Sequence, residues 1–210
     1  NEGDWSYWSG TITGGKKENI WTEMHPYDDL PRLKNPASGW VQNANDPPWT
    51  STYPIELHPD DYPPYMAPLP ASFRPQRAMR MMAEDSLITY DELVDYSHST
   101  RLEYADRVLD DLFAAVDAYG SAKAKEAKEV LEQWDRKADV ESRGTLLFYL
   151  CTSKFNVNDP SNYLTPWSLD HPYTTPAGIA YPEKAVELLE EAAAEMESVH
   201  GSLDVAWGDF

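Results

Sequence analysis

The stretch NPASGWVQNANDPPW, residues 35–49, brings together three Asn, two Trp and three Pro, and it contains neither a repeat nor a run of charge. Proline fixes φ and cannot donate a backbone hydrogen bond, so we expect a stiff loop rather than a helix. On an extended segment Asn43 and Asn45 would point to one face, because side chains two residues apart do so. They would then offer two uncharged amide donors to one cleft; alternatively, both side chains bond to turn backbone, as Asn often does.

The proline-rich character extends well beyond this stretch. Residues 25–75 hold most of the prolines of the chain, including the pairs at 47–48 and 63–64, and they predict a long irregular segment. Such a segment in a compact protein usually carries function or wraps another element. Before it, residues 1–24 alternate in the manner of strands around Gly14 and Gly15, which predicts a hairpin.

A helical pattern replaces the prolines from Gln76 onward. Thr89 and Glu92 are spaced as a capping box, and Pro182 and Gly201 stand where the last helix should begin and stop. We predict helices at 76–84, 89–97, 101–119, 121–134, 142–151 and 182–200, and a strand at 201–210. The chain is therefore predicted to be α+β and predominantly helical. It should consist of strands and irregular chain over 1–75, helices over 76–200 and a truncated strand over 201–210, with no linker between them.

The charge balance argues against two classes of partner. Lys and Arg number 17 and Asp and Glu number 36, which gives a net charge of −19. This charge repels nucleic-acid backbones and anionic membrane surfaces, and no apolar run approaches the ~20 residues that cross a bilayer. The single Cys151 lies in the apolar run LLFYLC, which is typical of a small buried side chain rather than of a reactive thiol.

Common catalytic signatures are absent from the sequence. It contains no GxGxxG, no Walker phosphate loop, no HExxH and no GxSxG. Its five His residues are scattered without ligand spacing, and no loop has the spaced oxygen ligands of a self-contained calcium site.

Several separated motifs resemble the penicillin acylase family of N-terminal nucleophile hydrolases, and within it most closely the acyl-homoserine lactone and lipid-amide acylases. They follow the family's order along nearly the whole chain: GDWSYW (3–8), LPRLKNPASGWVQNANDPPW (30–49), FRPQR (73–77), SRGTLLF (142–148), TPAGIAYPEKAV (175–186) and GSLDVAWGD (201–209). The resemblance implies a four-layer αββα fold, of which this chain would be an internal segment of the β subunit. Asn1 has neither hydroxyl nor thiol, so the resemblance implies that the nucleophile lies outside this chain.

The resemblance also implies roles for individual residues. Family members cut themselves into α and β subunits and attack an acyl amide with a newly exposed N-terminal Ser, Thr or Cys. An Asn of the NxN element donates to the oxyanion, which implies Asn45, with Asn43 as the nearest competitor. An Arg at the start of the next helical stretch lies near the nucleophile's amine, which implies Arg74. Arg77 and Arg80 are the alternatives to Arg74 for this role. Without that role, both are expected to be charged residues on the helix surface.

For the whole protein, the resemblance implies an amidohydrolase acting on an acyl-homoserine lactone or a penicillin-like amide, with a lipid chain favoured over a phenylacetyl group. Its partners would be the remaining parts of the α and β subunits, and the family's export suggests a periplasmic or secreted protein. No cofactor is expected, although some relatives carry a structural calcium, for which Asp60 and Asp61 are the residues to consider. Two other interpretations stay open: an exported, aromatic-rich binding module, and a catalytically inactive acylase homologue.

Overall fold

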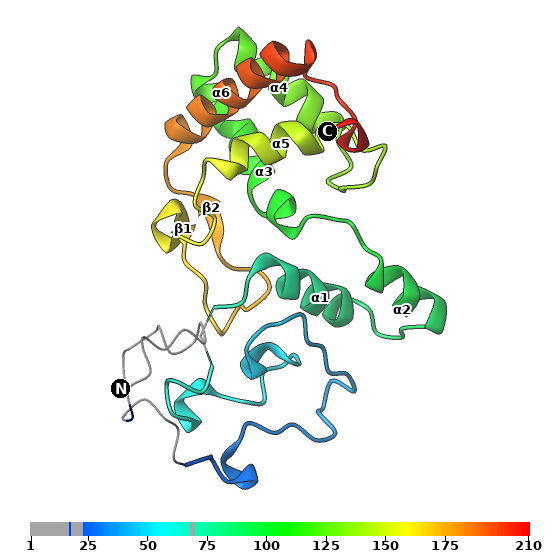
Figure 1. Cartoon of the computed structure of the whole chain (residues 1–210), viewed down its shortest axis with the longest axis vertical. Coiled ribbons are helices and arrows are strands. Elements are labelled where there is room, and N and C mark those ends of the chain that lie inside the picture. Colours follow the sequence, from blue (N-terminus) through cyan, green and yellow to red (C-terminus); the bar gives the residue numbers. More distant parts are fainter. Residues whose placement is uncertain (1–16, 18–22, 68–69) are drawn as a thin grey trace.

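The computed structural model describes Lys17 and residues 23–67 and 70–210. Figure 1 shows an irregular part at one end of the long axis, residues 23–67, and a helical part at the other end. Helix α1 (Phe73–Glu84) lies between the two parts, and helix α2 (Tyr90–Ser97) projects to one side. The irregular part and the helical part therefore meet at α1.

Four helices build the core of the helical part: α3 (Glu103–Tyr119), α4 (Ala122–Gln133), α5 (Thr145–Ser153) and α6 (Pro182–His200). Helix α6 contacts each of the other three. The apolar stripe predicted for 101–119 is confirmed, because α3 buries Val108, Leu109, Leu112 and Val116 in this core. Each buried side chain of this size stabilises the fold by about 1.5–3 kcal/mol relative to an exposed one.

The helix ends follow local signals in the sequence. The predicted capping box is confirmed, since the N–H of Glu92 donates to Thr89 Oγ1 at 3.3 Å and the N–H of Thr89 donates to Glu92 Oε2 at 2.8 Å. Gly201 ends α6 with a φ of 71°. Gly144 precedes α5 with a φ of 101°, and a Cβ there would lie 2.7 Å from the Cβ of Trp134. These glycines fit conformations that other residues adopt only with strain.

Two helices begin three residues away from their predicted starts. Helix α1 starts at Phe73 rather than at Gln76, so that Arg74 and Pro75 lie in its first turn. Proline is tolerated there because the first N–H groups of a helix have no intrahelical partner. Helix α5 starts at Thr145 rather than at residue 142, because the left-handed Gly144 interrupts the helical geometry.

The strands are the least accurate part of the prediction. Strand β1 (Tyr163–Thr165) pairs antiparallel with β2 (Ala177–Ile179), and the sequence analysis missed both because three residues show no usable periodicity. The strand predicted for 201–210 is wrong: Ala206 forms one isolated bridge with Arg143, and Trp207–Asp209 form the 3-10 turn η7. The hairpin predicted for 1–24 lies almost entirely outside the described residues.

The α+β class and the predominance of helix agree with the described residues. Within 23–67 the described chain forms only the 3-10 turns η3 (Tyr27–Asp29), η4 (Pro48–Thr50) and η5 (Pro59–Asp61), as the prolines predict. The β1–β2 pair is the only sheet over residues 23–67 and 70–210. A four-layer sandwich therefore stays a prediction from the family.

Candidate active site

Asn45 lies in a tight turn rather than on an extended segment. Its φ is 61°, in the left-handed region that Asn tolerates better than most residues. Asn43 stabilises this turn, because its Oδ1 accepts from the N–H of Asn45 at 3.1 Å and its Nδ2 donates to the carbonyl of Asp46 at 3.3 Å. The extended geometry predicted for the two Asn is therefore wrong. Asn43 serves the turn backbone, and the exposed side chain of Asn45 is left for chemistry.

Arg74 reaches Asn45 from the first turn of α1. Its Nη2 donates to Oδ1 of Asn45 at 2.8 Å, although the two residues lie 29 positions apart in the sequence. A guanidinium group only donates, so the amide presents its oxygen to Arg74 and turns its Nδ2 away. Among the described residues none accepts a hydrogen bond from that Nδ2, and the side chain is exposed. The structure thus brings together the two residues selected from the sequence and leaves one amide donor available.

The carboxylate of Asp46 stabilises the turn by accepting three hydrogen bonds. Its Oδ1 accepts from the N–H of Ala44 at 2.7 Å, and its Oδ2 accepts from Gln42 Nε2 at 2.8 Å and from Thr50 Oγ1 at 2.5 Å. Thr50 is fully buried, so these bonds anchor the exposed turn to the interior of the irregular part. The sequence analysis missed Asp46, although the tendency of Asp to bond to backbone two residues away could have indicated its role.

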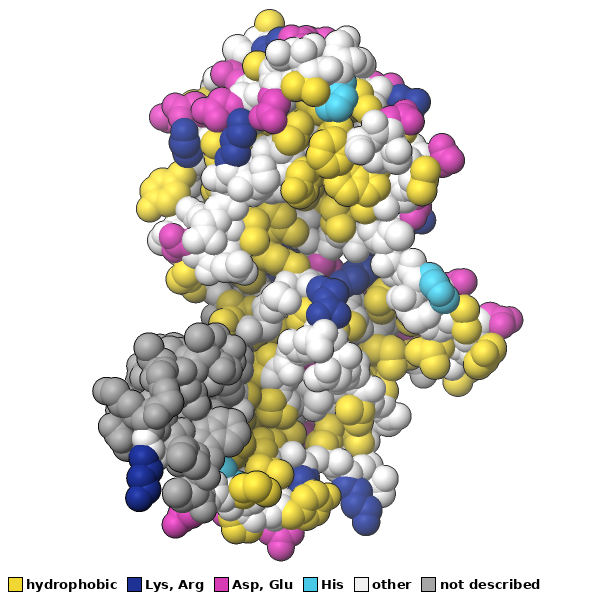
Figure 2. Space-filling view, viewed as in Figure 1, with side chains coloured by type: hydrophobic (Ala, Val, Ile, Leu, Met, Phe, Trp, Pro, Cys, Tyr) yellow, Lys and Arg dark blue, Asp and Glu magenta, His cyan; other side chains and the backbone are white. Residues whose placement is uncertain are grey.

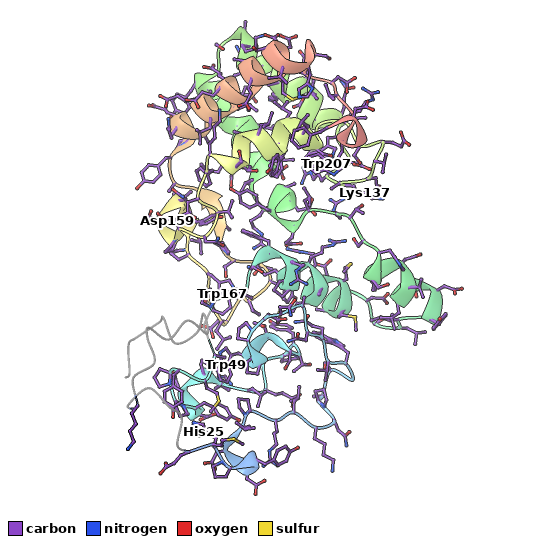
Figure 3. The ribbon with its side chains drawn as sticks, in the orientation of Figure 1. His25, Trp49, Lys137, Asp159, Trp167 and Trp207 are labelled. Carbon is purple, nitrogen blue, oxygen red and sulfur yellow. The ribbon has the colours of Figure 1, made fainter. Side chains whose placement is uncertain are left out.

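Aromatic packing supports the base of the loop. Trp49 is 2% exposed, and its ring centroid lies 5.3 Å from that of Tyr62. Figure 3 shows Trp49 among the side chains of the irregular part, on the side of α1 away from the helical part. The N–H of Gln42 also donates to the carbonyl of Ser51 at 2.8 Å, which ties the two arms of the loop together.

A buried ionic cluster fixes α1 against α3. The Glu103 carboxylate, whose side chain is 1% exposed, accepts from Arg80 Nε and Nη2 at 2.8–3.1 Å and from Arg107 Nη2 at 2.6 Å. The same two Arg donate to the carbonyl of Tyr173 at 3.0 and 2.7 Å. Arg80 is therefore not surface charge but a link between α1, α3 and the loop before β2. Glu103 was not identified from the sequence, because a Glu at the start of a helix is ordinarily solvated.

A cleft of about 860 Å³ opens beside this site, between α1, α2, the segment 99–104 and α5. Its wall includes Asn43 and Ala44, which adjoin Asn45, together with Arg74 and Arg77 of α1. Figure 2 shows Lys or Arg side chains at the waist of the molecule and hydrophobic side chains on the helical part just above them. Burial raises the pKa of Tyr104, which lines the cleft, so its phenol stays uncharged near neutral pH.

The remaining candidates do not form a site. Asp60 and Asp61 are exposed in η5, and over the described ranges no three or more His, Cys, Asp or Glu side chains cluster to hold a metal ion. A structural calcium therefore stays an expectation from the resemblance. None of the helices in the described part of the chain is long and apolar enough to cross a membrane. Cys151 is 5% exposed in the core, and burial raises the pKa of its thiol to about 12.

Comparison with known proteins identifies the family. A family model for penicillin amidase matches residues 6–210, which include Asn45, Arg74 and the residues around the cleft. The chain is also similar to the penicillin acylase 2 proenzyme of Pseudomonas sp. (strain SE83), with 25% identity over 132 residues. That region is 63% of this chain and 16% of that protein, so this chain matches only a small part of its relative. Because the family model matches almost its entire length, the chain belongs to the penicillin amidase family.

Proposed function

We propose that this chain is part of an amidohydrolase that cleaves an acyl amide. The nucleophile would be the N-terminal residue of a β subunit and lie outside this chain. Within the chain, Asn45 would donate to the oxyanion, and Arg74 would hold Asn45 and contribute positive charge. Membership of the penicillin amidase family supports the reaction class.

The hydrogen bond from Arg74 to Asn45 is the observation that carries the residue roles. It engages the amide oxygen at 2.8 Å and so orients the NH₂ group away from Arg74. An oxyanion needs donors that are oriented before the reaction, because reorienting them during the reaction would add to the barrier. A neutral amide also donates at every pH, so the site needs no titrating group in this role.

In this reaction Asn45 would serve only to stabilise the oxyanion of the tetrahedral intermediate. Attack on the amide carbonyl carbon moves the π electrons of the C=O bond onto its oxygen, and the Asn45 N–H would bond to that anion. When the tetrahedral intermediate collapses, the C–N bond breaks and the amine leaves with a proton from the catalytic base. Loss of one such donor typically lowers turnover by about 10²- to 10³-fold.

The substrate we propose is an acyl-homoserine lactone or a penicillin-like amide, with an aliphatic acyl chain favoured over phenylacetyl. The name of the relative, a penicillin acylase proenzyme, supports the penicillin-like class and a precursor that is processed. We propose further that the other parts of the precursor are the partners of this chain and that the protein is periplasmic or secreted. Hydrolysis of N-decanoyl-homoserine lactone and of penicillin G by the processed protein would separate the two substrate classes.

The test of the residue roles is Asn45→Gly in the processed protein. Glycine accepts the left-handed φ of 61°, so this variant removes the amide without straining the turn. We expect kcat to fall by about 10²- to 10³-fold with an unchanged melting temperature. Asn35→Gly is the matched control, because Asn35 has a φ of 53° in the same segment and should be dispensable. Wild-type kcat in Asn45→Gly, or no hydrolysis of any acyl amide by the wild-type protein, would contradict the proposal.

A further inference from the structure

The cleft beside the candidate site is similar to small-molecule binding sites in its volume and in the side chains that line it. Its volume of about 860 Å³ falls in the range of roughly 300–1,000 Å³ that small-molecule pockets occupy. Its wall is rich in aromatic side chains contributed by α1, α3, α5 and η7: Phe73, Tyr104, Phe148, Tyr149 and Trp207. Trp207, labelled in Figure 3, belongs to η7 near the C-terminus of the chain, so α1 and this C-terminal turn both contribute to the aromatic wall.

Positive charge is concentrated at the α1 side of this cleft. Arg74 and Arg77 line it one helical turn apart. Among residues 23–67 and 70–210, Arg74 bonds only to a neutral amide oxygen, and the one carboxylate within 4.0 Å of Arg77 is Glu103, whose Oε2 lies 4.0 Å from Nη1. The Nε of Arg77 is buried and has no hydrogen-bond partner in the described structure. Two guanidinium groups therefore face the cleft without a full counterion.

The other charged side chains that line the cleft do not neutralise the positive charge of Arg74 and Arg77. Glu103 lines the cleft, but Arg80 and Arg107 bond directly to its carboxylate at 2.6–3.1 Å. Arg101 also lines it and is paired with Asp106 through two hydrogen bonds of 2.6 Å. In a chain of net charge −19, an anion entering this cleft thus meets local positive charge.

From this arrangement we propose that the cleft binds an aliphatic carboxylate. The carboxylate lies between Arg74 and Arg77, where guanidinium groups offer paired donors, and the alkyl chain lies along the aromatic wall toward Trp207. The origin of such a ligand rests on the proposed function, because hydrolysis of an aliphatic acyl amide releases an acid of this kind. Binding itself requires only the residues of the cleft.

The test is calorimetric titration of the purified processed protein with sodium decanoate, with decan-1-ol as the uncharged analogue. We expect saturable binding of one decanoate and at least about tenfold weaker binding of the alcohol, because the alcohol cannot accept the charge-assisted hydrogen bonds that guanidinium groups donate to a carboxylate. Arg77→Gln should weaken decanoate binding by about tenfold for the same reason. Ala78→Trp, which fills the cleft from α1 and leaves both Arg in place, should weaken it as well.

Arg143→Gln is the control, because Arg143 lies outside the cleft beside Asp204 and should leave decanoate binding unchanged. Circular dichroism checks that each variant is folded, and the comparison of acid with alcohol needs no variant. The proposal is overturned if the wild-type protein does not bind decanoate, if the alcohol binds equally well, or if folded Arg77→Gln and Ala78→Trp both bind as wild type. Because turnover is not measured, these outcomes are independent of the effect of Asn45→Gly on kcat.

Discussion

At the level of single residues, the candidate site centres on Asn45, whose backbone is in the left-handed conformation and whose side chain and N–H are both hydrogen-bonded. Arg74 holds the side chain of Asn45 at 2.8 Å, and Asn43 holds its backbone N–H at 3.1 Å. Asp46 then ties the turn to the buried Thr50. The orientation of one exposed amide is therefore set by several short contacts rather than by burial.

Asp46 should matter to both stability and turnover. In Asp46→Ala, the N–H of Ala44 loses its acceptor, while Gln42 Nε2 and the buried Thr50 Oγ1 keep only their bonds to backbone carbonyls. We expect the unfolding free energy to fall by about 2 kcal/mol and kcat to fall as Asn45 loses its orientation. Urea denaturation and turnover of the processed protein measure the two effects. Asp29→Ala is the control, since Asp29 is exposed in η3; equal behaviour of the two variants would contradict the role of Asp46.

Cys151 should be inert in the native protein. Burial raises the pKa of its thiol to about 12, so the reactive thiolate is scarce at pH 8, and the side chain is 5% exposed. Iodoacetamide at pH 8 should leave the native chain unmodified by mass spectrometry and should alkylate the urea-unfolded chain completely. Alkylation of the native chain at the rate of the unfolded one would show that this thiol is accessible.

The residues of the site differ in how well the sequence could reveal them. Asn45 and Arg74 could be selected because they lie in recognisable motifs, and the structure places them in contact. Asp46 and Glu103 could not be selected in the same way, because their importance depends on partners such as Thr50 and Arg107. The left-handed turn at Asn45 was not predicted, because an extended chain was expected for the NxN element, with both Asn side chains on one face.

At the scale of elements, the position of Arg74 depends on how α1 is fixed. Helix α1 is held against α3 by the bonds of Arg80 to Glu103 and of Arg107 to Gln76, and its first turn carries Arg74 toward the loop. The helices were predictable because α3 repeats apolar residues over four turns and α6 has clear start and stop signals. The strands β1 and β2 were not, since three residues each contain too little pattern.

Glu103→Gln should destabilise the protein strongly. The substitution leaves the buried guanidinium of Arg107 without its counterion and that of Arg80 with only the exposed Glu84, and breaking a buried pair costs about 3–5 kcal/mol. Glu84→Gln is the matched control: it removes the other carboxylate of Arg80, which is 59% exposed, and should cost at most about 1 kcal/mol. Urea denaturation of both variants checks this, and similar losses would mean that the cluster does not hold α1.

At the scale of the whole molecule, stability is unevenly distributed. Helix α6 buries seven residues in the core, whereas α2 buries none and projects from the molecule (Figure 1). Between these extremes lies α1, which carries Arg74 and borders the cleft. The site is therefore built where the helical part, with its buried core, meets an irregular part whose elements over residues 23–67 are short 3-10 turns.

Hydrogen exchange should report this gradient in the isolated 210-residue chain. Amides of α2 should exchange through local opening, because few buried contacts oppose it, and amides of α6 should need global unfolding. We expect exchange in α2 to be faster by about tenfold or more, measured by mass spectrometry of peptides at neutral pH. Equal protection of the two helices would contradict the assignment of α2 as a weakly held arm.

The claim that Arg74 acts through Asn45 is tested most directly by a double-mutant cycle on kcat/KM for an acyl amide, with Asn45→Gly, Arg74→Gln and the double variant of the processed protein. We expect the two losses not to be additive, with a coupling of about 1 kcal/mol or more, because each residue needs the other to present the donor. Asn35→Gly combined with Arg74→Gln should be additive. Additivity of Asn45→Gly and Arg74→Gln within about 0.3–0.5 kcal/mol would show that Arg74 does not act through Asn45.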